Sequence, residues 1–184
     1  SQSYSHSLFF NSDPRTTPFD RTNFAPSTYF FINRYLDYRS IVDKIYIIGN
    51  GGSSSISSHV SVDFVKAAGI KSETFNNPNI ITCFANDYGH DNWVKEAINA
   101  YCSINDLIII ISSSGKSLNL VNAAKFCQKN NYDLITFTGF DKNNDVSKLG
   151  KINFHVNSRE YNYIEMAHHI ILVSIVDIFA KKIF

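Results

Sequence analysis

The sequence predicts a parallel α/β domain with helices on both faces of its sheet. From residue 45 onward, short apolar runs alternate with longer segments of helical character, and this alternation is typical of parallel strands joined by helical crossovers. Two of the apolar runs end in loops rich in serine, each directly before a predicted helix. The 184 residues, of which 44% are hydrophobic and 18% charged, match the size and composition of one globular domain.

Residues 1–26 are predicted to form an irregular N-terminal arm, because they are rich in Ser, Thr, Asn, Phe and Pro and show no sustained period. A single domain is expected over residues 27–184. Its first element is a predicted helix over residues 27–39, for which Ser27 is a candidate N-cap.

Five short apolar segments are predicted to be the strands of the sheet. They lie at residues 45–48, 80–84, 107–111, 134–138 and 152–156. The third is a run of five consecutive aliphatic residues, which indicates a strand buried on both faces. Further helices are predicted at residues 53–68, 92–104, 117–130 and 161–182, and Gly69 is a candidate C-cap of the first of these.

The net charge and the cysteines indicate which binding partners and which cell compartment to expect. A net charge of +1 gives no general field that would attract nucleic acid or an anionic membrane, so neither is an expected partner. No apolar run approaches the roughly 20 residues that span a bilayer. The cysteines, Cys83, Cys102 and Cys127, lie singly in apolar segments without metal-binding spacing, so we expect buried thiols in a cytoplasmic protein.

Two strand–helix loops carry the residue types of an anion site. The first predicted strand runs into GNGGSSS at residues 49–55, and the third runs into SSSGKS at residues 112–117. Ligands of doubly wound sheets bind beyond the carboxyl ends of the strands, where helix N-termini present free N–H groups to an anion. Either loop alone could be a simple turn with a serine cap, but two on neighbouring strands favour a phosphate cradle. Lys116 is expected to be solvated.

A dinucleotide site is the alternative for the first loop. Gly49, Gly51 and Ser54 approach the GxGxxG pattern, and Glu73 follows at about the distance of a ribose acceptor. The third glycine is missing, however, and the second serine loop has no role in such a site. A P-loop is excluded because GxxxxGK[ST] does not occur. We therefore expect no nucleotide cofactor.

Two predicted helices carry histidine and carboxylate side chains at helical spacing. His59 and Asp63 are four residues apart in the helix after the first loop. Glu165, His168 and His169 lie three and four residues apart in the terminal helix. The two groups could converge on one metal ion or on one path for proton transfer, as aldose–ketose isomerisation requires. The alternative for each histidine is a packed or surface side chain.

Three motifs give the chain a family resemblance: GNGGSSSISSH at residues 49–59, ANDYG at 85–89 and ISSSGKS at 111–117. It resembles the sugar isomerase (SIS) domain family and, within it, the phosphoheptose isomerases, over residues 45–180. The resemblance implies a five-stranded parallel, flavodoxin-like, three-layer sandwich and a homotetramer with active sites shared between subunits. It also implies conversion of sedoheptulose 7-phosphate into a heptose 7-phosphate for surface polysaccharide.

The resemblance assigns roles by position. Phosphate would be bound by Ser53, Ser112, Ser113, Ser114 and Ser117. The sugar would be lined by Asn50, Gly51 and Gly52, and its hydroxyls would be bound by Asp87, for which a turn-forming role is the alternative. The candidate catalytic side chains are His59, Asp63, Glu165, His168 and His169. Zinc is a candidate cofactor, with His59, Asp63, Glu165 and His169 as candidate ligands.

The chain departs from the family at three helical positions. Asp63 stands where the family has Glu, and Glu165 stands where it usually has Gln. Val173 replaces a histidine of the terminal helix and can neither exchange a proton nor bind a metal. His169, one turn earlier, is the candidate replacement, and His168 matches a histidine found in many relatives.

Two functions remain open on the sequence. The first is a sugar-phosphate isomerase. The second is a non-catalytic SIS module that binds a phosphosugar or a protein, since one close branch of the family binds the replication initiator and lacks the same terminal histidine. The Glu165, His168 and His169 cluster favours chemistry, because a binding module does not require it.

Overall fold

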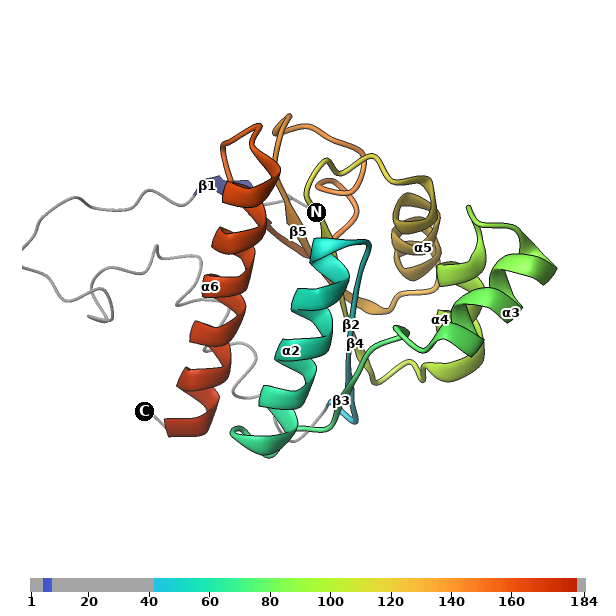
Figure 1. Ribbon diagram of the computed structural model, residues 1–184, viewed down its shortest axis with the longest axis horizontal. Coiled ribbons are helices and arrows are strands. Elements are labelled where there is room, and N and C mark those ends of the chain that lie inside the picture. Colours follow the sequence, from blue (N-terminus) through green and yellow to red (C-terminus); the bar gives the residue numbers. More distant parts are fainter. Residues whose placement is uncertain (1–4, 8–41, 182–184) are drawn as a thin grey trace, which may run out of the picture.

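The computed structural model describes residues 5–7 and 42–181, and the described residues form one sheet of six parallel strands with helices on both faces (Figure 1). The strand order is β1-β6-β5-β4-β2-β3. The strands are β1 (Ser5–Ser7), β2 (Ile45–Gly49), β3 (Ser72–Glu73), β4 (Leu107–Ser112), β5 (Asp133–Thr138) and β6 (Ile152–His155). The helices are α2 (Gly52–Lys66), α3 (Pro78–Tyr88), α4 (Trp93–Tyr101), α5 (Leu118–Lys129) and α6 (Tyr161–Lys181). The predicted α/β sandwich class is therefore confirmed.

Alternate residues of the central strands point to opposite faces and build two cores. Ile47, Ile109 and Phe137 pack with α2 and α6, which lie side by side on one face (Figure 1). Ile48 and Ile110 pack with α4 and α5 on the other face. Strands β2 and β4 are buried on both faces, and their sequences are nearly continuous apolar runs; β5 is buried as well but includes Thr136 and Thr138.

Four of the five predicted strands are confirmed, but the strand predicted at residues 80–84 is wrong. This segment lies in α3, whose start is fixed by Asn77 and Pro78: the Asn77 side chain accepts a hydrogen bond from the Asn79 N–H at 2.9 Å. The helix ends at Gly89, which has a φ of 80°. The apolar residues of the segment are spaced to pack on one side of a helix, against α4. The Asn-Pro start signal outweighs the short apolar run.

The edges of the sheet hold two short strands that the sequence pattern does not predict. β3 pairs with β2, and β1 pairs with β6. β1 lies within the arm predicted to be irregular, while the remainder of that arm and the helix predicted at residues 27–39 lie outside the described residues.

No apolar run long enough to span a bilayer is expected from the sequence, and the terminal helix α6 differs from this expectation. By length and composition it is the one helix in the described part of the chain that could cross a membrane. Leu172, Ile175 and Phe179 of α6 are buried against the sheet and α2. Its apolar character is that of a core helix.

The cysteines are free thiols, as expected, but they are not all buried. Cys127 is buried, and burial raises the pKa of its thiol to about 12. Cys102 is half-buried, and Cys83 is exposed on α3.

Candidate functional site

The two serine loops meet at the carboxyl edge of the sheet. Gly49 at the end of β2 pairs with Ile111 near the end of β4, so the loops that follow the two strands start side by side. Asn50 in the first loop and Asn119 in the first turn of α5 exchange two hydrogen bonds, each 3.0 Å long and each from a side-chain N–H₂ to the other side-chain carbonyl. The expected juxtaposition of the two loops is confirmed.

The second loop presents unpaired polar groups at the start of α5. Ser117 occupies the N-cap position without a side-chain capping bond, and the first turn of α5 contains no acidic residue. The exposed Lys116 ammonium is instead 3.3 Å from Asp141, which also accepts a hydrogen bond of 2.6 Å from Arg159. Ser117 thus leaves the N-terminus of α5 without a side-chain cap that would compete with an anion, and Lys116 is exposed to solvent as expected.

Several predicted site residues have buried polar atoms without a partner. In the described part of the chain, six buried side-chain atoms lack a hydrogen bond, and four belong to predicted site residues. These four are the hydroxyls of Ser112 and Ser113, Nδ1 of His168 and Nε2 of His169. A buried polar group left unpaired costs about 1–3 kcal/mol, so such groups are normally satisfied by water or a ligand. The two serine hydroxyls lie at and just after the end of β4, on the edge of the sheet where a polar ligand can bind.

A seam between α2 and α6 carries the titratable groups. His59 Nε2 is 3.1 Å from Asp63 Oδ2, and the His169 ring lies edge-on to the His59 ring with 4.8 Å between centroids. At the upper end of the seam, the Glu165 carboxylate lies directly against the backbone of Gly52, the first residue of α2. Gly52, His59 and Asp63 share one side of α2 because their spacing of seven and four residues is helical. We call Gly52, His59, Asp63, Glu165 and His169 the α2–α6 seam.

The environment of the seam favours a neutral His169. Burial lowers the pKa of His169, and the neighbouring His59 lowers it further, while Asp63 acts in the opposite direction. His59 is more than half exposed, with 57% of its side chain accessible. The seam is thus reached from the surface at His59, while His169 is held toward its neutral form.

Comparisons with known proteins support the family resemblance. A match to the SIS domain family spans residues 81–176. The phosphoheptose isomerase of Aliarcobacter butzleri is 32% identical over 134 residues, 68% of this chain and 69% of that protein. The phosphoheptose isomerase of Sulfurimonas denitrificans is 29% identical over 77% of this chain and 75% of its own. The structure of phosphoheptose isomerase GmhA from Neisseria gonorrhoeae has the same fold, with a TM-score of 0.74 and 21% identity over 84% of this chain and 85% of that one.

The chain belongs to the SIS domain family. Within this family it stands close to phosphoheptose isomerases, and the expectation of a phosphosugar isomerase enzyme agrees with these relatives. Fold class and family resemblance are thus both confirmed.

In this SIS domain, His168 lies apart from the α2–α6 seam. His168 is fully buried under α6, where its Nε2 donates a hydrogen bond of 3.1 Å to the Thr138 carbonyl at the end of β5. Burial lowers the pKa of His168 to about 4. His168 is therefore a neutral donor that fastens α6 to the sheet, in contrast to the surface-facing His59 and His169.

Three polar residues behind His168 were not predicted from the sequence. Thr138 donates a hydrogen bond of 3.1 Å to the side-chain carbonyl of Asn153, and its hydroxyl lies 3.3 Å from His155 Nδ1. Burial lowers the pKa of His155 as well. Thr138 pairs with Ser112 across β4 and β5. The sequence did contain one signal for this group: Thr138 is a polar residue at the end of a predicted buried strand.

Asp87 belongs to α3, outside the two serine loops. It lies in the last turn of α3 rather than in a turn, is exposed, and accepts a hydrogen bond of 2.9 Å from the neighbouring Asn86 side chain. In Figure 1, α3 lies beyond α5, well away from α2 and α6. Its predicted contact with sugar hydroxyls remains a prediction.

Val173 and the candidate zinc ligands complete the description of the seam. Val173 is half-buried and packs against the core shared by α2 and α6, so the family's terminal histidine has an apolar substitute here.

The candidate zinc ligands are a separate question. His59 and Asp63 are paired with each other, and no three His, Cys, Asp or Glu side chains of the described residues are arranged to hold a metal ion. This donor arrangement does not fit a zinc site, and we assign no step to a metal.

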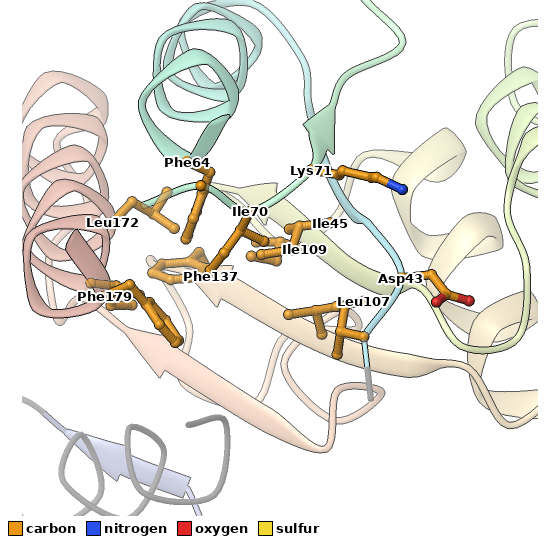
Figure 2. A pocket seen from close by; sticks show the side chains of 13 residues that line it. Asp43, Ile45, Phe64, Ile70, Lys71, Leu107, Ile109, Phe137, Leu172 and Phe179 are labelled. Atoms are coloured by element: carbon orange, nitrogen blue, oxygen red, sulfur yellow. The ribbon is translucent and has the colours of Figure 1, made fainter. Parts of the chain in front are cut away.

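A cavity of about 230 Å³ lies at the opposite, amino edge of the sheet (Figure 2). Phe64, Ile109, Phe137 and Phe179 converge on it from α2, the sheet and α6. Its walls are mainly hydrocarbon and include none of the serines of the two loops. The cavity is therefore unsuited to a sugar phosphate and is separate from the candidate site.

Proposed function

We propose that this SIS domain is an aldose–ketose isomerase of a phosphorylated sugar, acting on sedoheptulose 7-phosphate to give a heptose 7-phosphate for surface polysaccharide precursors. The observation that supports it is the meeting of two serine loops at the carboxyl edge of the sheet, where the buried hydroxyls of Ser112 and Ser113 have no partner among the described residues. The names of the relatives supply the substrate class. The expected location is the cytoplasm.

The phosphate would bind at the second loop. The hydroxyls of Ser112 and Ser113, with Ser114 and Ser117 nearby, and the free N–H groups of α5 form a set of donors with a favourable helix dipole. The buried Ser53, at the start of α2, would approach from the first loop. This anchoring would place the sugar chain over Asn50, Gly51 and Gly52 and leave its carbonyl end in the α2–α6 seam.

The seam has the groups that proton transfer requires. Asp63 accepts the Nε2 hydrogen of His59, which leaves Nδ1 of a neutral His59 free to act as a base. His59 would remove the proton from the hydroxyl-bearing carbon next to the carbonyl, and Asp63 would stabilise the resulting imidazolium. His169, whose lowered pKa keeps it neutral, would supply the proton that the carbonyl oxygen takes up. The His59 imidazolium then returns its proton to the former carbonyl carbon, while the hydroxyl on the neighbouring carbon gives its proton back to His169, which forms the aldose and restores both histidines.

Exposed apolar side chains beside the seam support an oligomer with shared sites. Val62 of α2 and Met166 and Ile170 of α6 each expose more than half of their surface. Large exposed hydrophobic residues that flank a polar site are typical of subunit interfaces. We propose a homotetramer in which neighbouring subunits cover the seam, and sedimentation analysis will measure its size.

A panel assay tests the activity. The protein is incubated with ketose phosphates of five, six and seven carbons, with and without zinc, and the products are separated and identified. We expect an aldose phosphate from the seven-carbon substrate. Product from a different chain length would correct the substrate, and a requirement for zinc would show that the donors rearrange around a metal. Absence of product from every ketose phosphate would overturn the isomerase.

A non-catalytic module is the second candidate, and Val173 is the observation that favours it. The packing of Val173 into the core leaves the seam without the histidine that the family carries there. A binding or protein-interaction module would bind phosphosugars in calorimetry without forming product. It would also tolerate loss of Asp63, whereas an isomerase would not.

A further inference from the structure

Glu165 occupies the helix end that a substrate anion would otherwise approach. A Cβ atom on Gly52 would lie only 2.6 Å from Cδ of Glu165 and would overlap its oxygens. The first turn of α2 has no acidic residue of its own, and its N-cap Gly51 provides no side-chain cap. The Glu165 carboxylate therefore supplies the negative charge at the positive end of α2.

The Glu165 carboxylate has no partner cation among the side chains that the structure describes. Within residues 42–181, Glu165 forms no hydrogen bond or ion pair that would neutralise it. The nearby His59 is already paired with Asp63, and His169 is held toward its neutral form. The seam consequently contains two carboxylates, and any ligand group that enters it meets a negative field. A ligand phosphate would therefore bind at the second loop, at the start of α5, and not in the seam.

We propose that Glu165 is a specificity-determining residue, which makes the seam accept sugar phosphates with neutral hydroxyl donors at the reacting end and reject those with a second anionic group there. This inference rests on the proposed phosphosugar site. A carboxylate accepts hydrogen bonds from hydroxyls but repels a carboxylate or phosphate in the same space. A carboxamide at this position would accept from hydroxyls equally and donate to an anion.

Two inert ligands of equal length isolate this effect. Glucitol 6-phosphate ends in a neutral hydroxyl group and 6-phosphogluconate ends in a carboxylate, while both keep the phosphate. Titration calorimetry of the full chain should show that 6-phosphogluconate binds at least about tenfold more weakly, as like charges in one site predict. In Glu165→Gln the affinity for 6-phosphogluconate should rise by about tenfold, whereas the affinity for glucitol 6-phosphate should change less than about twofold.

The control is Glu160→Gln, which makes the same chemical change at an exposed position just before α6 and should alter neither affinity. Equal or tighter binding of 6-phosphogluconate by the unmodified protein would overturn the inference without the use of any variant. An unchanged affinity ratio in Glu165→Gln would overturn it as well, while leaving the phosphosugar site intact. If neither ligand binds the unmodified protein, the phosphosugar site itself falls, and the inference falls with it.

Discussion

Asn50 and Asn119 join the two serine loops through a reciprocal pair of 3.0 Å hydrogen bonds between their side-chain amides. Asn119 Oδ1 also accepts the N–H of Leu120, so the same side chain braces the first turn of α5. One amide pair thus sets both the spacing of the loops and the position of a helix N-terminus. The phosphate donors on the two loops depend on this pair for their relative placement.

Replacing Asn119 by Ala should weaken phosphate binding and stability together. The change removes one partner of a partly buried reciprocal pair and leaves Asn50 unpaired, which should lower the free energy of unfolding by about 1 kcal/mol. Denaturant unfolding and titration with inorganic phosphate measure the two effects. Asn122→Ala is the control, since Asn122 of the same helix only donates to the Asp91 carbonyl near the surface. Equal effects of both substitutions would contradict the role of the pair.

Asp63→Asn should abolish turnover and preserve ligand binding. The amide cannot stabilise a protonated His59, so kcat should fall by about 10²- to 10⁴-fold, the usual contribution of acid–base groups. The affinity for glucitol 6-phosphate should stay within about threefold, because the phosphate donors lie elsewhere. Asp91→Asn, an exposed position outside the seam, controls for the loss of charge. An active Asp63→Asn enzyme would remove the His59–Asp63 pair from the mechanism.

Gly115→Ala should disorder the second serine loop. Gly115 has a φ of 65°, and a Cβ there would come within 2.7 Å of Cβ of Asn144 and overlap its side-chain oxygen. Asn144 is itself fixed by its hydrogen bond of 2.8 Å to the Asp141 carbonyl. Overpacking of this kind costs about 1–3 kcal/mol. Phosphate affinity should fall as well, because the loop holds the serine donors.

Gly69→Ala is a matched control for this substitution. Gly69 has nearly the same φ, 67°, but nothing within 4 Å of its Cβ position. Its substitution should therefore show only the backbone cost of a positive φ, about 1 kcal/mol, and no change in phosphate binding. If the two variants are equally stable and bind phosphate equally well, the contact with Asn144 is not what shapes the loop.

His168 should make the fold sensitive to acid. Its folded pKa of about 4 lies below the ordinary value of 6.5, so the unfolded chain takes up a proton between these values and the folded chain does not. Stability is therefore complete above about pH 6.5 and decreases as the pH falls toward 4. At pH 5 the loss from this residue amounts to about 2 kcal/mol relative to pH 7.

The comparison of urea unfolding at pH 7 and pH 5 isolates this contribution. His155 and His169 have lowered pKa values too and act in the same direction, so the readout is the difference between proteins. His168→Gln should lose less stability than the unmodified protein on going to pH 5. His90→Gln, at an exposed position, should behave like the unmodified protein. An identical pH dependence in all three would show that His168 is not buried in its neutral form.

The sequence by itself determined the α/β class, the buried strands β2, β4 and β5, and the two serine loops. These features are local: a run of aliphatic residues or a cluster of serines before a helix has the same meaning wherever the chain folds. It also marked His59 and Asp63 as neighbours, because four residues in a helix bring side chains together. The strand predicted at residues 80–84 was wrong, because a short apolar run fits both a strand and a helix. The Asn77-Pro78 signal for a helix start decided between the two.

Only the tertiary structure decided which titratable groups share the α2–α6 seam. His168 and His169 are adjacent in sequence, yet one is buried against Thr138 and the other lies against His59, because adjacent helical residues point about 100° apart. Helical spacing does not predict which part of the protein each of these two side chains will contact. The contact of Glu165 with Gly52 likewise joins residues far apart in the chain, and it exists because the packing of α6 on α2 brings them together.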